Sequence, residues 1–109
     1  MAKNVLELTD ENFDSEVLKS NVPTLVDFWA TWYAPCRAIA PVVEQLATEY
    51  AGKVKVGKLD IDSHQKYAQQ FEVRSIPTLL VFKNGNVVGQ IVGAVPRAKI
   101  EDALKKALA

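Results

Sequence analysis

The stretch Ala30-Thr-Trp-Tyr-Ala-Pro-Cys-Arg37 follows an apolar segment, Thr24 to Trp29, that is typical of a central β-strand. It leads into a helix predicted from about Pro35 to Tyr50, so Cys36 falls in the first turn of that helix. A helix N-terminus carries unpaired N–H groups and a partial positive charge, and both favour a thiolate. The end of this strand is therefore where the sequence predicts thiol chemistry.

The composition of the chain limits its class and its partners. Its 109 residues predict one domain, residues 1–109. The 13 Lys and Arg balance the 13 Asp and Glu, which argues against a nucleic-acid partner. No apolar run approaches the ~20 residues of a membrane span. The N-terminal residues lack a signal-peptide core, so we expect a cytoplasmic protein.

The chain contains one cysteine and one histidine, His64, so it allows no internal disulfide and no zinc site within one chain. We therefore expect neither a metal nor another cofactor. His64 itself is expected in a solvated loop or at a helix start.

Outward from Cys36, the hydrophobic periodicity predicts strands that alternate with helices. The predicted strands are 5–8, 24–29, 54–61, 78–82 and 87–92, and the predicted helices are 12–19, 35–50, one that starts at 62–65, and one after Pro96. The alternation implies parallel strands with crossover helices, whereas Asn84-Gly85 predicts a hairpin that adds an antiparallel edge. The predicted fold is α/β, a central mixed five-stranded sheet flanked by four helices.

From Val5 to Leu108 this order and spacing resemble the thioredoxin fold, and residues 32–36 resemble the Trp-Cys-Gly-Pro-Cys active site of the thioredoxin family. In that family the first cysteine attacks a substrate disulfide and the second resolves the mixed disulfide. Here Cys36 matches the second cysteine, whereas Tyr33 and Ala34 replace the first cysteine and the glycine. The resemblance implies protein-disulfide reductase activity. This chain is expected to be inactive or strongly impaired in that activity, because the Tyr33 phenol, with an ordinary pKa of about 10, does not replace a thiolate.

The sequence allows two interpretations of Cys36 and two of Tyr33. Cys36 is either an inert, buried thiol or a slow monothiol that forms mixed disulfides. Tyr33 is either a hydrogen-bond donor to a bound peptide or a surface aromatic that blocks the thiol below it.

Asp27 is a carboxyl group within an apolar strand. If it is buried there, its pKa is raised, because desolvation penalises the ionised form. The alternative is an Asp that reaches the surface. The resemblance places Asp27 beneath Cys36, where the family's Asp assists deprotonation, and Lys58 beside it. Lys58 either partners Asp27 or reaches solvent as an ordinary strand lysine.

Ile76-Pro77-Thr78 matches the family's loop with a cis proline that faces the active site. The resemblance implies an apolar docking groove that presents backbone to an extended protein segment, in the manner of β-strand addition. Its expected members are Trp32, Pro35, Ile76, Pro77, Val92, Gly93 and Ala94. Taken singly, each of these apolar residues is equally explained by core or turn packing. Trp29 is expected to support the site from the core.

Three functions remain open on this evidence. The first is a thioredoxin-type reductase disabled at the attacking cysteine, with disulfide-containing or extended protein segments and a thioredoxin reductase as partners. The second is a binding module that uses the groove without redox chemistry. The third is a monothiol protein that acts through Cys36. The retention of Asp27 favours a redox origin, because its burial is costly without a thiol to serve.

Overall fold

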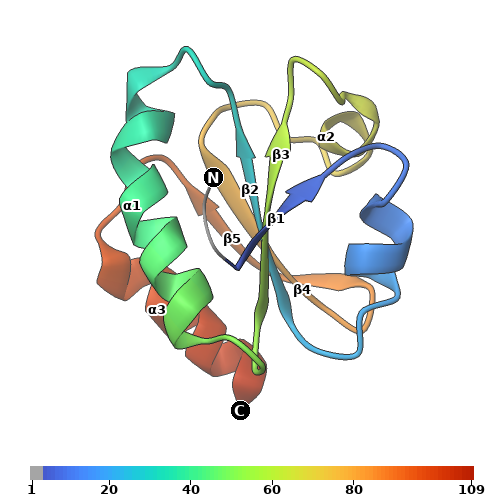
Figure 1. Ribbon diagram of the computed structural model, residues 1–109, viewed down its shortest axis with the longest axis vertical. Helices are drawn as coiled ribbons and strands as arrows, with labels where there is room; N and C mark the ends of the chain where they lie inside the picture. The colour runs from blue at the N-terminus through green and yellow to red at the C-terminus, as the bar shows by residue number, and fades with distance from the viewer. Residues whose placement is uncertain (1–3) are drawn as a thin grey trace.

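The computed structural model describes residues 4–109 (Figure 1) and confirms the α/β fold with its five-stranded mixed sheet. The elements are β1 (Val5–Leu8), the π-helix η1 (Asp14–Leu18), β2 (Thr24–Trp29), α1 (Ala34–Glu49), β3 (Lys55–Asp60), α2 (Lys66–Gln70), β4 (Thr78–Lys83), β5 (Asn86–Val92) and α3 (Arg97–Leu108). The strand order is β1-β3-β2-β4-β5. The predicted absence of a signal-peptide core rests partly on residues 1–3, which lie outside the described part of the chain.

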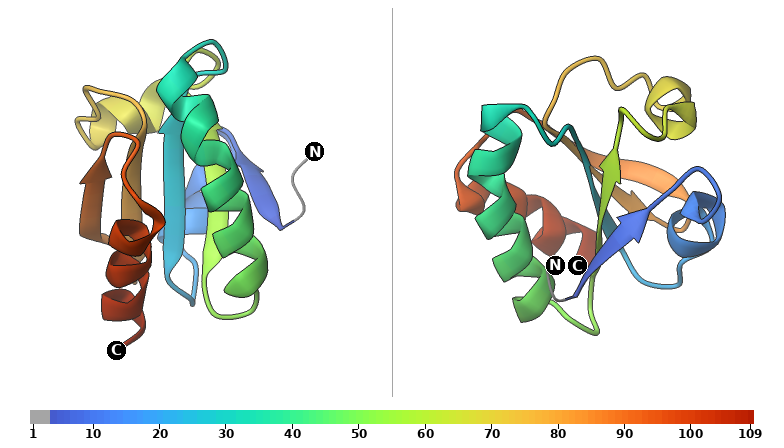
Figure 2. Two further views of the ribbon diagram at one scale, coloured as in Figure 1. Left: turned by 90° about the vertical axis from the view of Figure 1, so that its left-hand side faces the viewer. Right: turned by 45° about the horizontal axis from the view of Figure 1, so that its top comes forward.

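The sheet separates two hydrophobic cores, because successive side chains of a strand point to opposite faces. Leu25 of β2 packs with residues of α1 and α3 on one face, while Val26 and Phe28 pack toward η1 and α2 on the other. The ribbon shows α1 and α3 on one side of the sheet and η1 and α2 on the other (Figure 2). By the same alternation Asp27 shares the face of Leu25, toward α1 and α3.

Parallel and antiparallel pairing together bring three strand ends to one edge of the sheet. β3 pairs in parallel with both β1 and β2, whereas β4 pairs antiparallel with β2 and β5. The register sets Phe28 opposite Thr78, and Thr78 opposite Val92. The end of β2, the start of β4 and the end of β5 therefore meet where α1 begins.

Two predicted helices are shorter than the periodicity indicated. The first is η1, and the turn before it carries a reciprocal capping pattern: Asn12 N donates to Thr9 Oγ1 at 3.0 Å, and Thr9 N donates to Asn12 Oδ1 at 2.7 Å. The second begins at Lys66 rather than at 62–65, because Asp62 N donates to the Asp60 carboxylate at 2.9 Å and holds a turn there. Side chains that satisfy backbone groups locally compete with helix formation.

The remaining boundaries agree closely with the pattern. The predicted strand 54–61 is Lys55–Asp60, and the predicted helix 35–50 is Ala34–Glu49. The hairpin at Asn84-Gly85 is confirmed, with φ of 54° and 81° at the two turn residues. Positive φ at both positions is what a two-residue hairpin of this kind requires.

Candidate functional site

Cys36 lies in the first turn of α1, behind an extended Tyr33 that precedes the helix. The Tyr33 carbonyl accepts hydrogen bonds from the backbone N–H groups of Cys36, at 3.1 Å, and Arg37, at 3.2 Å. The Cys36 side chain is fully buried. Burial raises the pKa of the Cys36 thiol, and the nearby Asp27 carboxyl adds to the rise, while a backbone hydrogen bond at Ala30 opposes it. Desolvation thus outweighs the Ala30 hydrogen bond and the positive charge of Lys58, which both lower the pKa, and the site does not favour a thiolate.

Trp32 and Tyr33 form an exposed aromatic pair just before the helix that carries the buried thiol. Their side chains are 62% and 38% exposed, and their ring centroids are 5.5 Å apart in an edge-on arrangement. The Trp32 indole Nε1 donates to Asp62 Oδ2 at 2.7 Å, from the loop that follows β3. Arg37 Nη1 donates to the Trp32 carbonyl at 2.9 Å. Trp32 is therefore both exposed and fixed in orientation.

Asp62 is a contributor that the sequence did not reveal. It lies 30 residues from Trp32 in the chain. The sequence pattern places it only at the start of a helix. The bond exists because β3 and β2 are neighbours, which brings the loops after them together.

Asp27 is a fully buried carboxyl group, as its apolar strand predicts. Neither of its oxygens has a hydrogen-bond partner within residues 4–109. Burial raises the pKa of Asp27 to about 7, and the positive charge of Lys58 partly opposes the rise. The desolvation cost of ionisation is therefore largely uncompensated.

Lys58 is the register partner of Asp27 on the neighbouring strand, but the two do not form an ion pair in the described structure. Its ammonium lies instead 3.8 Å from the centroid of the Trp29 ring. Lys58 was expected either to pair with Asp27 or to reach solvent, and the structure shows neither arrangement fully. Its positive charge acts on Asp27 through space, and its ammonium group lies over the face of the Trp29 ring.

The segments around Pro77 and Gly93 also lie at this edge of the sheet. The Ile76–Pro77 peptide is cis, and Gly93 N donates to the Pro77 carbonyl at 2.8 Å. This bond joins the start of β4 to the segment after β5. Val92 is 52% exposed there, whereas Pro77 is buried. The other expected members, Pro35, Ile76, Gly93 and Ala94, are half-buried or exposed.

Two further classes of site find no support in the described residues. Residues 4–109 contain no group of three or more His, Cys, Asp or Glu side chains arranged to hold a metal ion. Among the helices of that range, none has the length and apolar character needed to cross a membrane.

Comparison with known proteins agrees with this architecture. A family model described as Thioredoxin matches residues 4–106. Thioredoxin C-2 of Corynebacterium nephridii is 54% identical over 100 residues, which are 92% of this chain and 93% of that protein. Thioredoxin 1 of a Nostoc species is 50% identical over 102 residues, or 94% of this chain and 95% of that protein. The thioredoxin of Haemophilus influenzae is 49% identical over 102 residues, with the same shares.

Proposed function

Because the chain belongs to the thioredoxin family, we propose that it is a protein-disulfide reductase scaffold whose cycle stops at the missing attacking thiol. Its remaining activity is then to dock protein segments at the edge where α1 begins. Disulfide-containing or extended segments and a thioredoxin reductase are the proposed partners. A cytoplasmic location and a single domain stay predictions.

One observation carries the proposal: Cys36 is the chain's single cysteine, and its side chain is fully buried. Reduction of a substrate disulfide transfers two electrons, and in an exchange reaction a second thiol must displace the first from the mixed disulfide. One thiol cannot close that cycle. A buried thiol with a raised pKa is also a poor first attacker, since the thiolate is the nucleophile.

The proposal is tested by restoring the missing group. Insulin reduction is measured with dithiothreitol as the electron source, using this chain and its Tyr33→Cys variant. We expect the unchanged chain to remain at the rate of dithiothreitol alone and Tyr33→Cys to exceed it. The matched control is Tyr33→Ser, which removes the aromatic ring without supplying a thiol.

Three outcomes would contradict the proposal. Activity of the unchanged chain would show that Cys36 attacks alone. Equal activity of Tyr33→Ser and Tyr33→Cys would show that the ring had merely blocked Cys36. A folded Tyr33→Cys variant that does not reduce insulin faster than dithiothreitol alone would show that the scaffold no longer supports thiol–disulfide exchange.

A docking role has its own observation, the exposed but fixed Trp32 indole. An aromatic side chain that is already held in place loses little conformational entropy when a partner binds. The test is titration of the unchanged chain with an extended, cysteine-free apolar peptide. We expect Trp32→Ala to weaken binding and Val87→Ala, on an exposed part of β5 away from the α1 end, to leave it unchanged. Equal binding by Trp32→Ala would exclude Trp32 from the docking surface.

A further inference from the structure

A single side chain joins two loops that lie far apart in the sequence. Asp10 N, in the turn between β1 and η1, donates to His64 Nδ1, in the loop between β3 and α2, at 3.3 Å. His64 lies in a loop, as expected from the sequence, but its side chain is only 24% exposed and is therefore less solvated than expected. An imidazole nitrogen accepts a hydrogen bond only when it carries no proton. The contact is therefore a property of neutral His64.

Protonation of His64 would place two N–H donors against each other at this contact. The Asp10 carboxylate offers a replacement acceptor, because its Oδ2 lies 4.0 Å from His64 Nδ1. Its Oδ1 is buried and has no hydrogen-bond partner within residues 4–109. The imidazole must move to exchange the backbone donor for the carboxylate, since 4.0 Å exceeds a hydrogen-bond distance.

The other charged groups near His64 line the same hollow of about 540 Å³. They are Glu7 of β1, Glu44 of α1, and Lys58 and Asp60 of β3. Together with Asp10, which contacts the imidazole directly, four carboxyl groups and one ammonium border His64 or the hollow that it lines. A positive charge on His64 thus meets a mainly negative environment.

The loop that carries His64 also holds the exposed tryptophan of the site. His64 N donates to the Asp60 carbonyl at 3.0 Å, and Asp62 N donates to the Asp60 carboxylate at 2.9 Å. The Gln65 amide closes the turn on the Asp62 carbonyl at 2.8 Å. These internal bonds make residues 60–65 one compact unit, so a shift at His64 is transmitted to Asp62, the partner of Trp32.

We propose that His64 is a pH-dependent positioning residue: when its imidazole is protonated, the 60–65 loop moves toward Asp10 and changes the orientation of Trp32 through Asp62. An imidazole is the side chain whose ordinary titration falls between pH 5 and 8. The consequence for partner binding rests on the docking surface proposed above, whereas the structural change does not.

The test follows the Trp32 indole N–H and the Asp10 backbone N–H by NMR from pH 5 to 8.5. It uses the Asp27→Asn variant, because the buried Asp27 carboxyl has a pKa of about 7 and would titrate in the same range. We expect both signals to shift with the same midpoint as the His64 ring protons. In Asp27→Asn/His64→Asn both shifts should vanish, since the amide can bond to Asp10 but does not titrate.

Three results would overturn the proposal. They are a Trp32 signal that stays constant while His64 titrates, a Trp32 transition that persists in the double variant, and a His64 ring that does not titrate in this range. The Trp29 indole N–H is the internal control, because a shift of both indoles would indicate a general change of the fold. A Trp32 transition without peptide binding at any pH would support the positioning role and count against the docking function.

Discussion

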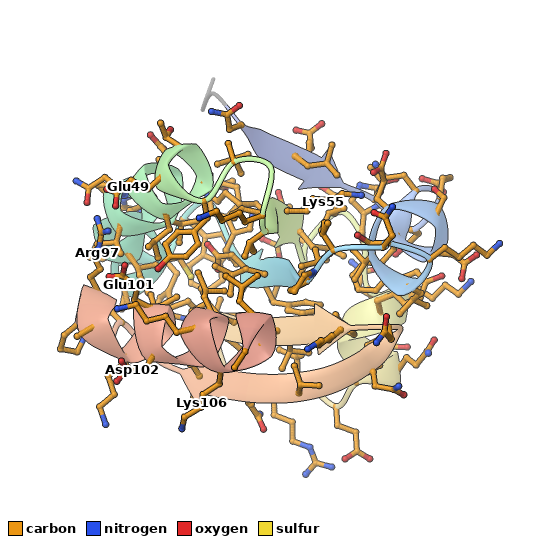
Figure 3. The ribbon with its side chains drawn as sticks, turned by 90° about the horizontal axis from the view of Figure 1, so that it is seen from below. Glu49, Lys55, Arg97, Glu101, Asp102 and Lys106 are labelled. Atoms are coloured by element: carbon orange, nitrogen blue, oxygen red, sulfur yellow. The ribbon has the colours of Figure 1, made fainter. Side chains whose placement is uncertain are left out.

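Charged residues occupy two very different regions of this molecule, the seam between α1 and α3 and the core beneath Cys36. In the seam, Arg97 Nη1 donates to Glu49 Oε2 at 2.9 Å, and Tyr50 Oη donates to Glu101 Oε2 at 2.7 Å. Figure 3 shows Glu49, Arg97 and Glu101 gathered where the two helices meet. In the core, the Asp27 carboxyl is buried without a hydrogen-bond partner among the described residues.

The pKa values of the carboxyl groups move in opposite directions in these two regions. The Arg97 guanidinium lowers the pKa of Glu49, and the Tyr50 hydroxyl together with Arg97 lowers that of Glu101. Burial raises the pKa of Asp27 to about 7. Partners favour the ionised form and desolvation penalises it, so the seam stabilises the fold while Asp27 destabilises it. A role of Asp27 in the chemistry of the site stays a prediction.

The largest expected effect is a gain of stability when Asp27 is replaced. Because the pKa of Asp27 rises from 3.8 to about 7 on folding, the native state binds its proton more tightly than the unfolded chain. Stability should therefore fall as pH rises from about 4 to about 7 and level off above that. At pH 8, Asp27→Leu should gain up to about 4 kcal/mol, at 1.36 kcal/mol per pKa unit.

The measurement is urea unfolding of this chain and Asp27→Leu at several pH values. The gain should shrink steadily below pH 7, and what remains at pH 4 measures the neutral carboxyl group, which is still buried without a hydrogen-bond partner among the described residues. Asp27→Asn is the variant of matched size and should gain less, because a buried amide also lacks partners. Equal or lower stability of both variants at pH 8 would mean that the carboxyl group supports the core.

A second effect concerns Cys36, which shares the buried region with Asp27. Its fully buried thiol should react with DTNB at least about 100-fold more slowly in the native chain than in denaturant, because local opening must precede the reaction. The absorbance of the released thiolate measures both rates. The Tyr33→Ala variant tests which residues protect the Cys36 thiol from DTNB. Faster labelling of this variant would show that the Tyr33 ring protects the thiol, and an unchanged rate would show that the rest of α1 does. Rapid native labelling would support a monothiol function.

The smallest effect is expected in the seam, where the charges are paired but accessible. Arg97→Gln should lower the thermal midpoint slightly, and the loss should diminish at high salt because exposed ion pairs are screened. Lys19→Gln is the matched control. This variant breaks the 3.0 Å ion pair between Lys19 and Asp14. Both side chains of that pair are more exposed than those of Arg97 and Glu101, so its loss should change the thermal midpoint less. An effect of Arg97→Gln as large as that of Asp27→Leu would reverse the comparison of the two regions.

Local patterns in the sequence predicted most of the fold but less of the site. Alternation and helical periodicity located all five strands and the long helices α1 and α3, because burying one face requires that spacing. They overestimated the length of the helices before β2 and after β3, and in the second case the Asp60 carboxylate bonds to nearby backbone where the helix was expected to start. Such competition depends on side-chain geometry and leaves no period in the sequence.

By itself the sequence determined that the chain has one thiol, that Tyr33 stands where the family's attacking cysteine would be, and that a carboxyl group lies within an apolar strand. Only the tertiary structure decided that the ammonium of Lys58 rests on Trp29 rather than pairing with Asp27. It also decided that Asp62 holds Trp32 and that His64 contacts Asp10. The Trp32–Asp62 and Asp10–His64 contacts join residues that are 30 and 54 positions apart. They arise because the parallel pairing of β1, β3 and β2 brings the loops after those strands to one edge of the sheet.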